Sequence, residues 1–313
     1  MSAAKKQEPS PSGPVWLGSP LKWLLGGGRP VLIVLVLSGV LCGGGTLAWV
    51  KLKPQILGSP EYRVGPEQIE ITPLPPWIHT DIRAEVFRSP TLDGPLLLMD
   101  DDLIERLAKA FAQHPWVAKV ESVAKQFPAL VKVSLVYRQP VCMVEVPGGL
   151  LPVNEEGVLL PSTNADFSPL EASRYPRLVR IERTPAVSTG GRWGDPRVVG
   201  AAEIAAALGP AWERMRLDRI EPLAVDPAAG AAGAAAGDSS RRAREPIFAV
   251  FTRGGSRIVW GYAPGANMLG EAPAAEKVAR LLQYLADHDT LDGPQGKRQE
   301  LDVRTLGKAA PSR

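Results

Sequence analysis

The sequence is poor in cysteine and histidine, and this scarcity excludes several kinds of site. Its 313 residues include two cysteines and three histidines. Cys42 lies inside an apolar run and Cys142 lies far downstream, so a bridge would have to join a membrane to a folded body. We therefore expect no disulfide framework. His79, His114 and His288 have no partner at ligand spacing, and we expect no metal site.

Motifs for catalysis and nucleotide binding are also missing. There is no P-loop, nucleophile elbow or dinucleotide fingerprint. The carboxylates of Asp100 to Asp102 fit a helix start and those of Glu155 and Glu156 a tight turn, while His114 fits a helix cap or the surface. A net charge of +3 demands no nucleic acid. We expect no enzyme, cofactor or small-molecule substrate.

One long apolar run dominates the N-terminal region. Val31 to Val50 contains no charged residue, and a helix of that length spans about 30 Å, the thickness of a bilayer core. Basic residues flank the run, as expected at membrane interfaces. The sequence predicts a transmembrane helix over residues 30–51 that contacts the lipid bilayer. The side chains assigned to the anchor are Val31, Leu35, Leu41 and Trp49.

Other interpretations of the run fit less well. A cleaved signal peptide has a shorter apolar region and a small-x-small cleavage site, of which Thr46 to Ala48 is a poor version. A lipoprotein needs small residues before Cys42, and Val40 and Leu41 stand there. Gly43 to Gly45 fit either a close helix-packing surface or a flexible stretch of the anchor.

Charge gives the orientation only weakly. Four basic residues precede the run, but Lys51 and Lys53 follow it closely. We favour a cytoplasmic arm over residues 1–29, which is rich in Pro, Ser and Gly and is predicted to be disordered. A linker over residues 52–66 would then lead to an extracytoplasmic body.

The body begins with a predicted α+β module over residues 67–140. A short strand at Gln68 to Thr72 is followed by helices over Ile78 to Arg88 and from Asp100 to His114. Strands over Trp116 to Lys125 and Leu130 to Arg138 complete a β-α-α-β-β order, and the second alternates at period two.

A β-rich domain with flanking helices is predicted over residues 141–306. Short strands form a meander to Leu160, and another strand covers Tyr175 to Ile181. Asp195 and Pro196 open a helix, and a hairpin and an amphipathic helix over Pro273 to Asp287 follow. An Ala/Gly-rich insertion at 227–245 is predicted to be a flexible loop. The last strand covers Gln299 to Arg304, before a free tail at 307–313.

Several short motifs follow one another along the body. They are Leu103 to Leu107, His114 to Val117, Phe127-Pro128, Val131 to Val136, Tyr137 to Val141, Val153 to Val158 and Tyr175 to Leu178. Together with the arm and the apolar run, their order resembles the FtsQ/DivIB family of bacterial division proteins. The resemblance covers roughly residues 20–306. Two departures from the family pattern are the Pro73 to Pro76 stretch and the Ala/Gly-rich insertion.

The resemblance implies a POTRA module followed by a β domain. It implies a non-enzymatic, single-pass scaffold in the inner membrane at the division site, which recruits divisome partners and helps control septal peptidoglycan synthesis. Partners similar to the FtsB/FtsL pair would add a strand to the last strand of the β domain. An exposed edge strand offers unpaired backbone groups for this. The residues concerned are Glu300, Leu301, Asp302, Val303 and Arg304. The alternative is that this strand simply completes the sheet and binds no partner.

Two rival functions remain open. A POTRA-containing export or assembly factor normally carries a long downstream β-barrel, for which this sequence has no room. An anchored cell-wall enzyme would need a catalytic constellation in the second module, where none is visible.

Overall fold

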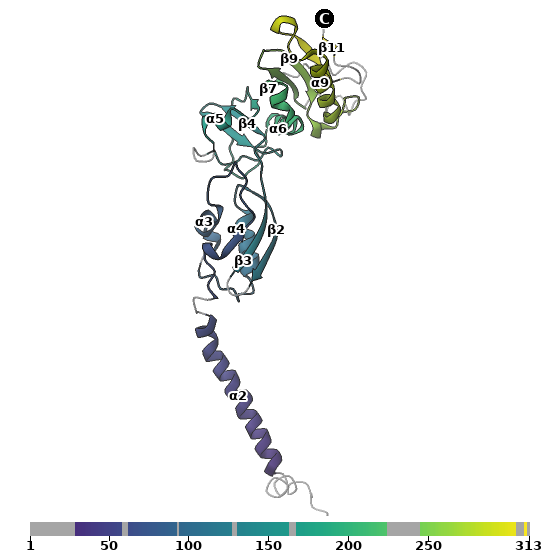
Figure 1. Ribbon diagram of the computed structural model, residues 1–313. Helices are drawn as coiled ribbons and strands as arrows, with labels where there is room; N and C mark the ends of the chain where they lie inside the picture. Colours follow the sequence, from purple (N-terminus) through teal and green to yellow (C-terminus); the bar gives the residue numbers. More distant parts are fainter. Residues whose placement is uncertain are drawn as a thin grey trace, which may run out of the picture. The chain divides into compact units, whose positions relative to one another are not determined.

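Within the residues that it describes, the computed structural model is a mixed α+β protein with one long apolar helix and two β-sheets (Figure 1). It describes residues 29–57, 62–92, 94–126, 130–162, 167–223, 245–304 and 310–311. The helices are α2 (Arg29–Leu57), α3 (Ile82–Phe87), α4 (Leu103–Ala112), α5 (Pro169–Ala172), α6 (Pro196–Leu208), α7 (Ala211–Arg214) and α9 (Ala274–His288). The strands are β1 (Ile69–Ile71), β2 (Val117–Gln126), β3 (Leu130–Tyr137), β4 (Cys142–Val146), β5 (Gly149–Val153), β6 (Arg177–Leu178), β7 (Leu217–Leu223), β8 (Ile247–Thr252), β9 (Arg257–Tyr262), β10 (Glu300–Asp302) and β11 (Ala310–Pro311).

Helix α2 contains the predicted membrane run. Among the described residues, its segment Ile33–Leu52 is the one helix long and apolar enough to cross a membrane. The helix continues to Leu57, into the stretch predicted as a linker. Pro54 lies in the last turn of α2. Proline has no backbone N–H to donate, but the helix continues for three more residues.

The first sheet has the order β1-β3-β2, with β1 parallel and β2 antiparallel to β3. The alternation predicted in β3 is confirmed, because Val131, Val133 and Leu135 are buried. Helix α4 places Leu107 and Phe111 against them, and α3 adds Ile82 and Val86 to the same core. Asp81 caps α3 by accepting from the backbone N–H groups of Arg83 and Ala84.

His114 is buried rather than at the surface. Its side chain lies after α4, where Nε2 is 3.0 Å from a carboxylate oxygen of Glu85 in α3. Its Nδ1 accepts from the backbone N–H of Trp116 at 3.3 Å. The expected surface role is therefore wrong. The contacts do not match the expected capping role either, because the two ring nitrogens contact Glu85 and the backbone of Trp116, which lie outside α4. The imidazole ties the end of α4 to α3.

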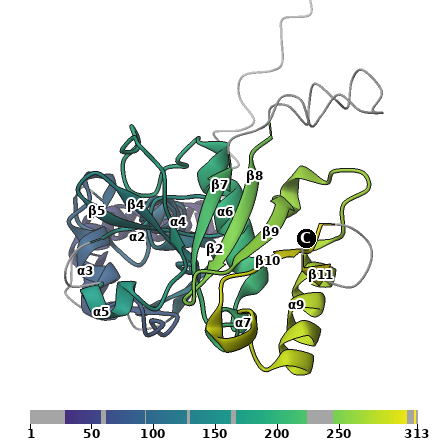
Figure 2. The same ribbon diagram turned by 90° about the horizontal axis from the view of Figure 1, so that it is seen from above.

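The second sheet has eight strands in the order β11-β10-β9-β8-β7-β6-β4-β5. The expected hairpin β8–β9 and the antiparallel pair β4–β5 are present. The sheet also contains parallel pairs, β4–β6, β6–β7 and β9–β10, which a meander does not predict. Parallel neighbours need a crossover, and α6 with α7 connects β6 to β7. Helix α9 connects β9 to β10 (Figure 2).

Helices α6 and α9 share a core with the second sheet. Helix α6 begins after Asp195, whose side chain accepts from the backbone N–H of Arg197 as predicted. Its Ile204 and Leu208 are buried against sheet residues that include Phe248 and Trp260. The predicted strand at Tyr175 to Ile181 is shorter than expected, since only Arg177 and Leu178 pair.

The chain divides into two compact units, Met1–Arg63 and Val64–Arg313. The predicted boundary at 140–141 lies inside the second unit, which holds two separate hydrophobic cores. The predicted arm before Arg29, the turn at Phe127 to Ala129 and the Ala/Gly-rich stretch up to Arg244 lie outside the described residues.

The thiol of Cys142 gives a direct test of the second core. Burial raises the pKa of this thiol from 9.0 to about 12, although a backbone hydrogen bond with Leu178 acts in the opposite direction. Because the thiolate is the reactive form, we expect alkylation of Cys142 in the folded chain to be at least about a hundredfold slower than after unfolding. The measurement is iodoacetamide labelling at pH 8 of a Cys42→Ala variant.

The same shift predicts a loss of stability at high pH. The folded pKa lies above the unfolded value, so this contribution is complete below pH 9 and is lost as the pH rises toward 12. A Cys142→Ala variant should therefore lose less unfolding free energy across that range. Rapid labelling of native Cys142 would contradict the assigned core position.

Candidate functional site

The candidate site is the end of the second sheet that carries β10. Glu300, Leu301 and Asp302 form this strand, parallel to β9. Val303 follows and continues the ladder, since its N–H donates to the carbonyl of Val259 at 3.3 Å. Leu301 and Val303 are fully buried, whereas Arg304 is exposed. The five predicted residues therefore lie together in the structure, and the side chains of Leu301 and Val303 belong to the hydrophobic core.

The position of β10 at the edge of the sheet requires a correction. Strand β11 pairs antiparallel with the outer side of β10, with Pro311 opposite Leu301 and Ala310 opposite Asp302. The terminal strand is therefore β11, formed within the stretch expected to be a free tail. Its sequence carries little signal, because a pair containing proline and alanine has low strand propensity.

The outward-facing backbone groups of β10 follow from strand geometry. Val303 donates to β9, and the carbonyl of Gln299 accepts from the N–H of Arg257 at 2.9 Å. Successive residues of a strand point their backbone groups to opposite sides, so the N–H and C=O of Asp302 point toward β11. The geometry assigns the exchanged hydrogen bonds to Asp302 and Ala310. Pro311 then stands at a position that requires no N–H.

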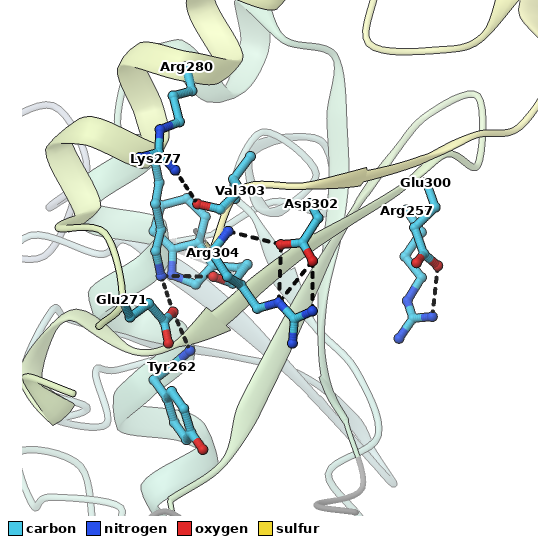
Figure 3. A network of polar contacts seen from close by, with 10 residues as sticks. Arg257, Tyr262, Glu271, Lys277, Arg280, Glu300, Asp302, Val303 and Arg304 are labelled. Atoms are coloured by element: carbon cyan, nitrogen blue, oxygen red, sulfur yellow. Dashed lines mark hydrogen bonds and ion pairs between the residues drawn. The ribbon is translucent and has the colours of Figure 1, made fainter. Parts of the chain in front are cut away.

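A buried ammonium holds helix α9 against the end of β9. Lys277 donates to the carbonyl of Trp260 at 2.8 Å and also bonds the carboxylate of Glu271 (Figure 3). Glu271 in turn accepts from the N–H of Tyr262 at 2.8 Å. Burial lowers the pKa of Lys277, and the interaction with Glu271 offsets only part of that effect.

Gly261 makes room for this carboxylate. Its φ is 91°, and a Cβ atom there would collide with the carboxylate of Glu271 and with the side chain of Arg304. Any other residue would be strained at this φ and would displace Glu271. The glycine therefore permits the contact between the loop before α9 and strand β9.

Arg280 fixes the chain just after β10. Its guanidinium donates to the carbonyl of Val303 at 2.9 Å (Figure 3). It also pairs with Glu276 one turn earlier in α9. The sequence places four apolar residues on one side of this helix, namely Val278, Leu281, Leu282 and Leu285. Leu281 is fully buried, and the other three are partly buried against the core. Lys277 and Arg280 were missed, although Lys277 lies one turn before the buried Leu281.

Ion pairs line the solvent side of β9 and β10. Arg257 on β9 pairs with Glu300 at 3.0 Å, and Arg304 makes a bidentate pair with Asp302 (Figure 3). Burial acts to raise the pKa of Asp302, but the hydrogen bonds and charge of Arg304 outweigh it and lower this pKa. These pairs leave the backbone of the strand as the feature best suited to bind another chain.

A cavity of about 300 Å³ lies beside the end of β9. Trp260, Tyr262, Met268, Pro273 and Lys277 contribute to its walls. The loop that forms it also contacts the chain just after β10, since the N–H of Ala272 donates to the carbonyl of Arg304 at 3.1 Å. The next residue after Met268 is Leu269, which is 78% exposed. Apolar surface is thus available next to the strand.

The predicted anchor residues lie in α2 and are exposed, as lipid-facing residues would be. The exposed fractions are 49% for Val31, 67% for Leu35, 79% for Leu41 and 62% for Trp49. Across the described segments, no group of three or more His, Cys, Asp or Glu side chains is arranged to hold a metal.

Removing the buried ammonium should destabilise this end of the sheet. Lys277→Met keeps the apolar stem but leaves the Trp260 carbonyl and the Glu271 carboxylate without this donor. We expect a loss of about 2–4 kcal/mol in the free energy of unfolding. Urea denaturation of the full chain in detergent micelles measures it.

Lys297→Met provides the matched control, because Lys297 is exposed. Its effect should stay within about 0.5 kcal/mol. Equal stability of the two variants would show that Lys277 does not hold α9 to β9.

A scan against protein-family models and a search among curated proteins find no match for this chain.

Proposed function

We propose that this chain is a single-pass membrane scaffold of the FtsQ type, which binds membrane-protein partners by strand addition at the end of its second sheet. The observation that carries the proposal is the outer side of β10, where main-chain groups face outward and, within the described part of the chain, only the two residues of β11 lie beyond. Added strands bind mainly through such groups.

Two further features support the proposal. Helix α2 suits a tether in the inner membrane, with the N-terminal arm in the cytoplasm and the body outside. The order β1, α3, α4, β2, β3 agrees with a POTRA-like module in front of a β domain. The scaffold would sit at the division site, bind partners similar to FtsB and FtsL, and help control septal peptidoglycan synthesis without catalysing a reaction.

A proline at position 302 tests the docking edge without removing the strand. Truncation after residue 298 would also remove Leu301 and Val303 from the core. Asp302→Pro instead deletes one outward N–H, and proline is tolerated on an edge strand where its nitrogen faces outward. We expect capture of FtsB/FtsL-like proteins from cell membranes to fall at least about tenfold, since the docked strand loses a ladder hydrogen bond and meets the proline ring.

Asp302→Ala is the matched control, because it removes the carboxylate but keeps the backbone N–H. It should capture partners nearly as well as the unmodified chain, and both variants should retain the thermal unfolding midpoint within a few degrees. Undiminished capture by Asp302→Pro would rule out docking at β10. A fluorescent fusion of the full chain should gather at the division site, and uniform membrane fluorescence would count against the scaffold function itself.

A further inference from the structure

Strand β11 is a short strand that pairs weakly with the outer edge of β10. Its two residues cover only Leu301 and Asp302 of β10. The hydrogen-bonded pair is Asp302 with Ala310, because the backbone groups of Asp302 point away from β9. Pro311 has no N–H, so it cannot donate to the ladder.

The balance of forces makes this pairing easy to reverse. Exchanged backbone hydrogen bonds contribute modestly in water, and ordering each residue of a strand costs a free energy of similar size. A pairing that extends over two residues therefore gains little net free energy. The populations of the chain with β11 docked on β10 and with β11 undocked should differ by no more than about tenfold.

We propose that β11 is a self-complementing strand, which occupies the docking edge of β10 until another antiparallel segment displaces it. The regulatory part of this inference rests on the proposed function, since it concerns the same edge. A docking segment needs the N–H and C=O of Asp302, and Ala310 already uses them. The two segments therefore exclude each other.

Disulfide trapping with a peptide tests this competition without a natural partner. The probe is a synthetic peptide of residues 305–313 with Ala310→Cys. The target carries Asp302→Cys and ends after Arg304, in a Cys42→Ala background. Directly opposite residues of an antiparallel pair have Cα atoms about 5.5 Å or less apart, within the range of a disulfide. A buffer of reduced and oxidised glutathione supplies the oxidant by thiol–disulfide exchange, and intact mass measures the peptide-bound fraction.

The comparison is with the full-length chain that carries the same Asp302→Cys and Cys42→Ala substitutions. Its own β11 competes at the roughly millimolar effective concentration of a segment in the same chain. With peptide below that concentration, we expect trapping to be about three- to tenfold lower in the full-length chain than in the truncated one.

Two controls make the result specific. The first moves the thiol to β9 by Arg257→Cys in place of Asp302→Cys. Position 257 on β9 lies two strands away from the docked peptide, because β10 lies between them. The distance between the two Cα atoms is then too long for a disulfide. The second is Ala310→Pro in the full-length target, which removes the N–H of β11 without truncation and should restore most of the trapping. It excludes an effect of truncation on the fold.

The outcomes separate this inference from the proposed function. Equal trapping in the truncated and full-length targets would overturn the competition. Trapping by the Asp302→Cys target no better than by the Arg257→Cys target would overturn docking of β11 at this edge. Neither readout uses a divisome partner, so failed capture of FtsB/FtsL-like proteins would count against the proposed function and leave these measurements unchanged.

Discussion

The edge of the second sheet depends on two cations that helix α9 buries. Lys277 donates to the carbonyl of Trp260 at the end of β9, and Arg280 donates to the carbonyl of Val303 just after β10. A buried cation is costly unless it is paired, and both have carboxylate partners. The pairs join the crossover helix to the two strands that it connects. The parallel alignment of β9 and β10, and therefore the direction of the outward-facing groups of β10, rests on this attachment.

The proposed function uses backbone rather than side-chain chemistry. The ion pairs of Arg257 with Glu300 and of Arg304 with Asp302 satisfy charges on the sheet surface, and they leave strand pairing as the main source of affinity. Strand pairing is also a hazard, because an open edge invites any extended chain. A short covering strand such as β11 reduces that hazard while it stays easy to displace. In the proposed function, α2 would keep the chain in the membrane that also holds its partners.

Periodicity and turn chemistry predicted much of the fold. The alternation of β3, the Asp195-Pro196 start of α6 and the β8–β9 hairpin are local signals, and the structure confirms them. The parallel neighbours of β6 and β9 depend on long-range crossovers, which no local pattern encodes. Lys277 and Arg280 were missed because charged residues in an amphipathic helix are usually assigned to solvent, although their long apolar stems can be buried. The five residues predicted for docking do lie together, but β11 could not be foreseen from two weak strand formers.

Docking of a partner at β10 can be measured in living cells by site-specific photocrosslinking. A photoreactive amino acid at position 302 of the full chain lies at the outer side of β10, and the same residue at the exposed position Glu145 on β4 serves as the control. If β10 is the docking edge of the proposed scaffold, position 302 should crosslink to a small membrane protein of the division site and position 145 should not. Equal crosslinking from both positions, or none to any membrane protein from position 302, would contradict docking at β10.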